Sequence, residues 1–105
     1  QHRAFYAMDD PENPELTLSF DLLMRGLEVT SGGQRIHKEQ EYRDKMLKRG
    51  MNPDAFRFYL DTFRNGMPPH GGFAIGLERI TACFLGINNV KECSMFPRDI
   101  NRVAP

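Results

Sequence analysis

An alternating pattern interrupted by a two-residue turn constrains the fold most strongly. Across residues 16–24 (LTLSFDLLM) apolar side chains recur at every second position, which predicts a strand with one strongly apolar face. Arg25-Gly26 follows, and residues 27–31 (LEVTS) resume the extended pattern, so the spacing predicts an antiparallel hairpin. In that register Met24 faces Leu27 and Leu22 faces Val29, whereas Asp21 and Thr30 share the other face with Glu28.

The period of the pattern then changes, and the change indicates helices. Residues 38–49 (KEQEYRDKMLKR) are rich in helix formers, and Gly50 supplies a stop. Asn52 is placed to cap a second helix over 53–65, whose apolar residues fall at i, i+3, i+4 and i+7 before Gly66.

The second half of the chain predicts a loop, a short strand and a third helix. Residues 66–72 (GMPPHGG) read as the loop, and 73–76 as the strand. Residues 77–85 predict a helix that is buried on most sides, whereas 88–105 carry little helical signal.

Composition excludes several classes of protein. The 105 residues include 14 basic and 14 acidic side chains, so we expect one domain at most and no basic nucleic-acid footprint along the whole chain. No apolar run approaches the roughly 18 residues of a membrane span, and no signal peptide is visible. Six methionines and two cysteines, Cys83 and Cys93, favour unpaired thiols in a reducing cytoplasm.

The segment GGFAIGLERI at 71–80 is the first candidate for chemistry. Its glycines leave bare backbone beside a strand, and a helix start with Arg79 offers N–H groups and a guanidinium to phosphate oxygens. Taken alone, glycines before a helix more often serve packing. The spacing is neither that of a Walker loop nor that of a dinucleotide fingerprint.

The segment LEVTSGGQR at 27–35 is the second candidate. The carboxylate of Glu28, the hydroxyl of Ser31 and the guanidinium of Arg35 could hold a magnesium ion and an acidic ligand. The alternative is a solvated strand face. Strict pleating puts Glu28 and Ser31 on opposite faces, so a shared site requires the strand to end or bulge near residues 31–33. For His37 and His70 we expect structural roles with satisfied hydrogen bonds.

Together these segments resemble the class II aminoacyl-tRNA synthetases. HGGFAIGLERI at 70–80 is similar to motif 3 of that family, and the stretches at 19–37, 59–80 and 96–105 resemble its aspartyl branch in the archaeal and eukaryotic form. Asparaginyl enzymes would be expected to show Ser-Gln-Arg-Glu at 33–36 and Phe-Pro-Arg-Thr at 96–99. The sequence reads Gly-Gln-Arg-Ile and Phe-Pro-Arg-Asp there, which favours aspartate.

The resemblance implies a fold and a set of roles. The fold is α+β, an antiparallel sheet flanked by helices, with residues 1–105 as the C-terminal portion of the catalytic domain and motif 3 at about 71–85. The implied reaction joins L-aspartate to ATP as aspartyl-adenylate and then to tRNA(Asp), with Mg²⁺ as cofactor. The implied site residues are Glu28, Gly76, Leu77, Glu78 and Arg79 for ATP, with Arg79 catalytic; Ser31 and Arg35 for aspartate; and Glu28 and Ser31 for the metal.

Other parts of the family's machinery lie outside this sequence. Motif 1, the motif 2 Arg-x-Glu and the anticodon-binding barrel are absent, and the chain opens at Gln1 in mid-pattern, so we expect a piece of a longer protein that is inactive alone. The resemblance implies a cytoplasmic homodimer that reaches tRNA through the full-length protein, without a membrane. Two alternatives stay open: an adenylate-forming paralogue that makes an amide without tRNA, and a non-catalytic interaction module.

Overall fold

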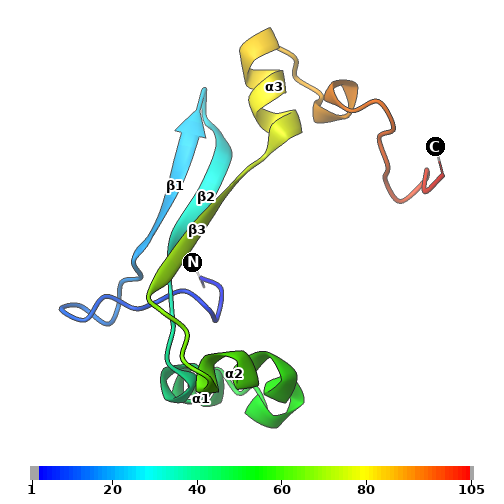
Figure 1. Ribbon diagram of the computed structural model, residues 1–105. Coiled ribbons are helices and arrows are strands. Elements are labelled where there is room, and N and C mark those ends of the chain that lie inside the picture. The colour runs from blue at the N-terminus through cyan, green and yellow to red at the C-terminus, as the bar shows by residue number, and fades with distance from the viewer. Residues whose placement is uncertain (1–2, 105) are drawn as a thin grey trace. The chain divides into compact units, whose positions relative to one another are not determined.

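The structure is a computed structural model that describes residues 3–104, and its fold is α+β (Figure 1). Three strands form one antiparallel sheet in the order β1-β2-β3: Ser19–Met24, Leu27–Arg35 and His70–Ile75. The α-helices are α1 (Glu39–Lys48), α2 (Arg57–Arg64) and α3 (Leu77–Leu85), with 3₁₀ turns η1 (Pro53–Phe56) and η2 (Val90–Cys93). The predicted fold class is confirmed.

The chain divides into two compact units. The helical unit comprises residues up to 19 and 32–72, and the hairpin unit comprises 20–31 and the residues from 73 onward. Strands β2 and β3 contribute residues to both units, so each unit is described separately below.

The predicted turn at Arg25-Gly26 is confirmed, and it belongs to the hairpin unit. Both residues have positive φ, +51° and +80°, as a type I′ turn between twisted antiparallel strands requires. The first strand is shorter than predicted because it begins at Ser19. Upstream of it, Thr17 makes only an isolated bridge with Asp9.

The predicted register, in which Asp21 shares a face with Thr30, does not continue as far as Ser31. A turn at 25–26 that pairs Met24 with Leu27 would set Asp21 opposite Thr30, yet the Ser31 hydroxyl donates to Asp21 Oδ1 at 2.8 Å. The ladder is therefore one residue out of step by the time it reaches Ser31, as a β-bulge produces.

We infer that the extra residue lies at Val29–Thr30, upstream of the bulge that the sequence predicts near 31–33. These adjacent residues are both buried, at 2% and 7% exposure, although neighbours in a regular strand point to opposite faces. The strand then continues through Gly32 and Gly33 to Arg35. One inserted residue between Glu28 and Ser31 returns these two side chains to the same face.

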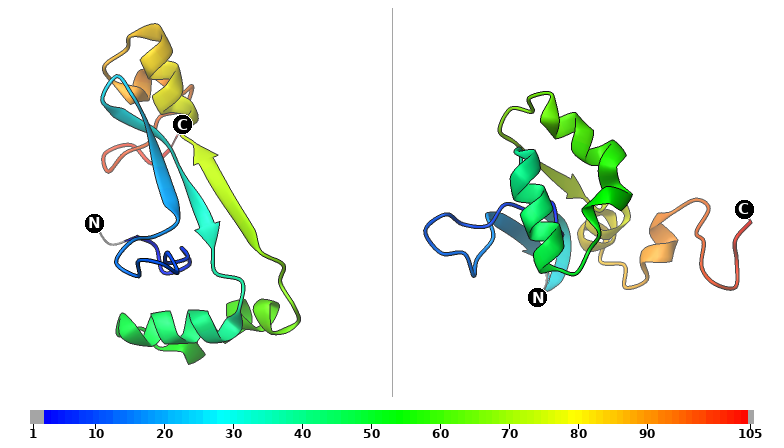
Figure 2. Two further views of the ribbon diagram at one scale, coloured as in Figure 1. Left: turned by 90° about the vertical axis from the view of Figure 1, so that its left-hand side faces the viewer. Right: turned by 90° about the horizontal axis from the view of Figure 1, so that it is seen from below.

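The helical unit packs α1 against α2 around its own core (Figure 2). The core cluster consists of Ile36, Tyr42, Met46, Leu60 and Phe63. Tyr42 is fully buried, and its hydroxyl lies 3.1 Å from that of Tyr59. Burial, together with this hydrogen bond, raises the pKa of Tyr42 well above its usual range.

The predicted helix over 53–65 is split into two pieces. Residues 53–56 form η1, where Asn52 accepts a hydrogen bond from the Asp54 amide at 3.0 Å, and α2 starts only at Arg57. The helix predicted at 38–49 is observed as α1, with Gly50 at φ +70° just beyond it. The strand predicted at 73–76 is longer and earlier, since β3 begins at His70.

Helix α3 has the predicted bounds but not the predicted burial. Only Ala82 and Cys83 are buried on it, whereas Leu77, Phe84 and Leu85 are 67–70% exposed. Both cysteines are free thiols, as expected. Within residues 3–104 no helix is long and apolar enough to cross a membrane.

Candidate functional site

Arg79 and Glu28 form the centre of the candidate site in the hairpin unit. Arg79, in the first turn of α3, donates from Nη1 to the Glu28 carbonyl oxygen at 2.9 Å. The same Nη1 lies 3.9 Å from Glu28 Oε1, and the two side chains are 50% and 44% exposed. An ion pair this exposed contributes only about 0–1 kcal/mol, so it leaves both charged groups accessible to a ligand.

Gly76 links the strand-to-helix junction to β2 and leaves room for the Arg79 side chain. Its amide donates to the Val29 carbonyl at 2.8 Å, and a Cβ at this position would lie 3.2 Å from Cδ of Arg79. No side chain caps the start of α3, where Leu77 and Glu78 follow Gly76. The junction thus presents helix N–H groups beside a guanidinium, an arrangement that suits phosphate oxygens.

Ser31 is held by a residue that the sequence interpretation overlooked, Asp21. Because the Ser31 hydroxyl uses its proton on Asp21 Oδ1, its lone pairs remain able to face a cation. Asp21 and Ser31 thus form a carboxylate–hydroxyl pair at this corner of the hairpin, and Glu28 lies three residues before Ser31 on β2. A signal was present in the sequence, since Asp21 is the one charged residue in SFDLLM.

The oxygen donors at this corner fit magnesium. Mg²⁺ is usually bound through one or two carboxylates together with waters and substrate phosphates, and Glu28, Asp21 and Ser31 offer such a set. In the part of the chain that the structure describes, no group of three or more His, Cys, Asp or Glu side chains is placed to hold a metal ion. A magnesium ion at this corner would need most of its ligands from water and substrate.

Arg35 belongs to the helical unit, where two neighbours define the place of its guanidinium. Its Cζ lies 5.3 Å from the centroid of the Tyr6 ring. A Cβ at Gly72 would come within 3.3 Å of its Nη2. The convergence of Arg35 with the Glu28–Arg79 pair in one cleft stays a prediction.

The two histidines differ. His70 Nδ1 lies 3.1 Å from the Pro68 carbonyl, and its ring stacks on Phe63, which is the structural role expected. The expectation is wrong for His37, whose buried Nδ1 has no hydrogen-bond partner.

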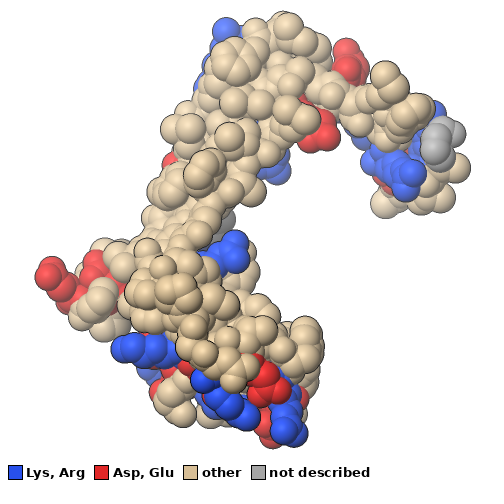
Figure 3. All heavy atoms as spheres, in the orientation of Figure 1, with Lys and Arg blue, Asp and Glu red and all other residues tan. Residues whose placement is uncertain are grey.

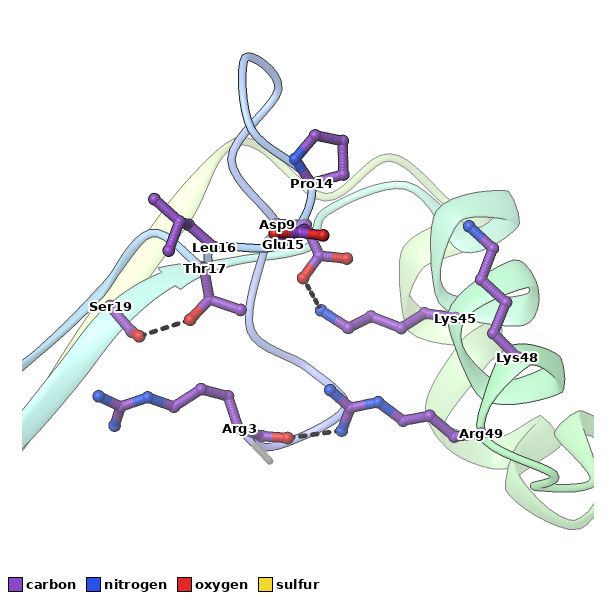
Figure 4. A pocket seen from close by; sticks show the side chains of 10 residues that line it. All are labelled: Arg3, Asp9, Pro14, Glu15, Leu16, Thr17, Ser19, Lys45, Lys48 and Arg49. Carbon is purple, nitrogen blue, oxygen red and sulfur yellow. Dashed lines mark hydrogen bonds and ion pairs between the residues drawn. The ribbon is translucent and has the colours of Figure 1, made fainter. Parts of the chain in front are cut away.

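A cavity of about 570 Å³ in the helical unit does not contain any predicted site residue (Figure 4). Its lining mixes both charge signs, and two of its cations have partners: Lys45 binds Asp9, and Arg49 donates to the Arg3 carbonyl. In Figure 4 the Lys48 amine and the Arg3 guanidinium point to different sides, so the cations do not converge on one ligand position.

Comparisons with known proteins agree with the motifs. The family model described as tRNA synthetases class II (D, K and N) matches residues 1–100. The chain is 54% identical over 103 residues to the aspartate–tRNA(Asp/Asn) ligase of Thermus thermophilus, which is 98% of this chain and 24% of that protein. It is 50% identical to the human cytoplasmic aspartate–tRNA ligase, over 98% of this chain and 21% of that protein.

Solved structures agree as well. The aspartyl-tRNA synthetase of Entamoeba histolytica superposes with a TM-score of 0.92 at 43% identity, covering 98% of this chain and 21% of that one. The asparaginyl-tRNA synthetase of Pyrococcus horikoshii gives 0.89 at 35% identity, covering 98% and 25%. The chain thus spans about a fifth to a quarter of the relatives it matches, and it belongs to the class II (D, K and N) tRNA synthetase family.

Proposed function

We propose that the chain is part of an aspartate–tRNA ligase, the C-terminal portion of its catalytic domain with motif 3 at about 71–85. The observation that carries the proposal is the Arg79–Glu28 contact, which joins the start of α3 to the strand that carries the candidate magnesium ligands. The relatives at 54% and 50% identity are both aspartate–tRNA ligases, which supports aspartate as the amino acid.

In the proposed reaction an α-carboxylate oxygen of aspartate attacks the α-phosphorus of ATP. The bond from that phosphorus to the bridging oxygen breaks, and pyrophosphate leaves. Arg79 binds the triphosphate tail and neutralises charge that grows on the leaving group. Gly76, Leu77 and Glu78 line the nucleotide beside it, where the bare backbone allows a close approach.

Glu28 and Ser31 hold the magnesium ion, with Asp21 orienting the Ser31 hydroxyl. The ion supplies positive charge to phosphate oxygens when it is bound. The corner is open and half-exposed, which allows ATP to bring its own oxygens as the remaining ligands.

Arg35 binds the side-chain carboxylate of aspartate. A guanidinium fork satisfies both oxygens of a carboxylate but meets the amide of asparagine with one donor facing another. An unpaired polar group of that kind costs about 1–3 kcal/mol, which disfavours asparagine. Ser31 is the second residue that we propose for aspartate binding.

The complete ligase extends the proposal beyond these residues. The aspartyl group passes to the terminal ribose hydroxyl of tRNA(Asp), and AMP leaves. We expect the complete ligase to be a homodimer. We also expect it in the cytoplasm, because the human relative is a cytoplasmic enzyme.

A chimeric ligase tests the proposal. This chain replaces the matching 103 residues of the Thermus thermophilus enzyme, and aspartate-dependent ATP–pyrophosphate exchange is measured. We expect exchange, and we expect Arg79→Ala to slow it by roughly 10²–10³-fold, since a fixed charge on the leaving group is lost. Arg57→Ala is the matched control, because Arg57 is 74% exposed on α2 and only faces Asp61.

Two results contradict the proposal. Exchange that depends on another amino acid would reject aspartate as the substrate. An Arg79→Ala chimera that exchanges at the rate of Arg57→Ala would make Arg79 a purely structural residue.

A further inference from the structure

The surroundings of Arg35 suggest how its fork is kept in place. The strand that carries it is the middle one of the sheet. On one edge, Arg35 bridges Ala7, and the Ile36 amide donates to the Tyr6 carbonyl at 3.0 Å. On the other edge lies β3, which carries Gly72. Both neighbours belong to the helical unit with Arg35.

The backbone at Gly72 leaves little room beside the guanidinium of Arg35. A Cβ built there would lie 3.3 Å from Nη2 and 3.7 Å from both Cζ and Nε of Arg35. An added methyl group would therefore press on the edge of the fork formed by Nη2 and Nε. At 3.3 Å the fork would have to move by a few tenths of an ångström.

The Tyr6 side limits such a movement. The guanidinium carbon lies 5.3 Å from the Tyr6 centroid, within the range of a cation–π contact. Tyr6 is itself restrained by the Phe5 ring, edge-on at 5.7 Å, and by the backbone hydrogen bond to Ile36. A fork held from both edges of β2 loses little side-chain entropy when it binds a carboxylate.

We propose that Tyr6 and Gly72 are positioning residues for aspartate selection: the Tyr6 ring and the missing side chain of Gly72 fix the plane of the Arg35 fork. This rests on the proposed function, because it assumes that Arg35 reads the aspartate side chain. It adds two positions beyond those proposed to bind ATP or aspartate, and they set how well the fork meets two carboxylate oxygens.

Steady-state exchange in the chimeric ligase tests this with three variants. Gly72→Ala and Tyr6→Leu should each raise the KM for aspartate by about 5- to 30-fold, since a small misplacement of a binding group is costly, and leave the KM for ATP within about twofold. Both should narrow the preference for aspartate over asparagine. Tyr6→Phe keeps the ring and should restore the aspartate KM to within about twofold of the unsubstituted chimera.

The controls separate this inference from a structural effect and from the proposed function. Thermal unfolding of each variant shows whether it folds, and aspartate titration by calorimetry measures binding without turnover. If Gly72→Ala fails to fold, Tyr6→Leu and Tyr6→Phe decide alone. An unchanged aspartate KM in folded Tyr6→Leu, or equal losses for aspartate and ATP, overturns the inference.

Measurements on the unsubstituted chimera and on Arg35→Gln show whether the proposed function or only the positioning inference is wrong. No aspartate-dependent exchange in the unsubstituted chimera would sink the proposed function itself. Exchange that is present, with an aspartate KM raised by Arg35→Gln but unmoved by Gly72→Ala and Tyr6→Leu, would sink only the positioning roles.

Discussion

Large apolar side chains behave differently in the two units. In the helical unit Ile36, Tyr42, Met46, Leu60 and Phe63 are all at most 6% exposed. The helical unit also exposes some large apolar side chains, among them Leu47 and Phe58. In the hairpin unit the buried apolar residues are the smaller Val29, Ala82 and Cys83, and most of the large ones are exposed. These are Phe20, Leu22, Leu23, Phe73, Ile75, Leu77, Phe84, Leu85, Met95, Phe96, Ile100 and Val103.

The difference reflects how far apart the partners lie in sequence. Helices α1 and α2 are neighbours in the chain and can bury each other's apolar faces. The hairpin and α3 have apolar residues that no nearby element covers, and exposed apolar surface of this extent is typical of a surface that further protein covers. Figure 3 shows the same contrast, with charges gathered over the helical unit and a largely uncharged surface over the strands and α3.

Truncation of a core residue should give the largest difference between the units. Leu60→Ala, at a fully buried position, should lower the free energy of unfolding of the 105-residue chain by about 2–5 kcal/mol. Phe84→Ala removes a larger side chain but one that is 69% exposed, so the change should stay within about 0.5 kcal/mol. Urea unfolding measures both, and equal losses would refute the contrast.

A buried ion pair should give the next largest effect. Lys45 is 9% exposed in its side chain, and its Nζ donates to Asp9 Oδ1 and to the Ala7 carbonyl, each at 2.5 Å. Asp9→Ala removes the counter-charge of that buried ammonium group and should lower the free energy of unfolding by about 1–3 kcal/mol. Lys91→Ala should cost less, because the Lys91–Asp99 pair of the hairpin unit is more exposed. Chemical denaturation at low and high salt compares them, and a larger loss for Lys91→Ala would contradict the assignment.

Substituting the glycine after a helix should destabilise the two units equally. Gly50 after α1 and Gly86 after α3 both have φ +70°. A Cβ at Gly50 would meet no atom within 4 Å, and a Cβ at Gly86 would meet only Arg25 Nη1, at 3.8 Å. Alanine at either position should therefore cost about 1 kcal/mol, from backbone conformation alone. Thermal unfolding of the two variants should shift alike, and a clearly unequal shift would mean that packing contributes at one of them.

The smallest expected effect is on stability at acidic pH, through the carboxyl group of Glu39. Hydrogen bonds from Arg64 and then Arg43 hold the pKa of Glu39 below its usual range. The stability that this carboxylate contributes is thus present above its unfolded pKa and is lost as the pH falls through its lower folded pKa. Arg64→Gln should bring the Glu39 pKa back toward its ordinary value, which an NMR titration of the carboxyl carbon reports. Arg57→Gln on the same helix is the control, and an unmoved Glu39 pKa in Arg64→Gln would rule out the assigned cause.

Sequence reasoning worked where a local rule governs the result. The turn at Arg25-Gly26 and the bounds of α3 follow from residues within a few positions of each other. It failed for the strand register, because the Ser31–Asp21 bond that reveals the shift joins residues ten apart. It also overestimated the burial of α3, since an apolar pattern says which face seeks cover and not whether the chain supplies that cover.

The candidate site divides in the same way. Glu28 and Arg79 could be singled out as polar residues beside glycines, and their contact is observed. Asp21, Tyr6 and the clearance at Gly72 could not be found from spacing, because each matters only through a neighbour on another strand or segment.

The extra residue in β2 makes the length of this segment as important as its composition. Deleting either Val29 or Thr30 would restore an unbroken ladder from the turn onward. The same deletion would turn Ser31 to the opposite side of the strand relative to Glu28. A one-residue deletion that makes the strand more regular would thus scramble the candidate site more thoroughly than most substitutions within it, which makes this segment intolerant of length variation.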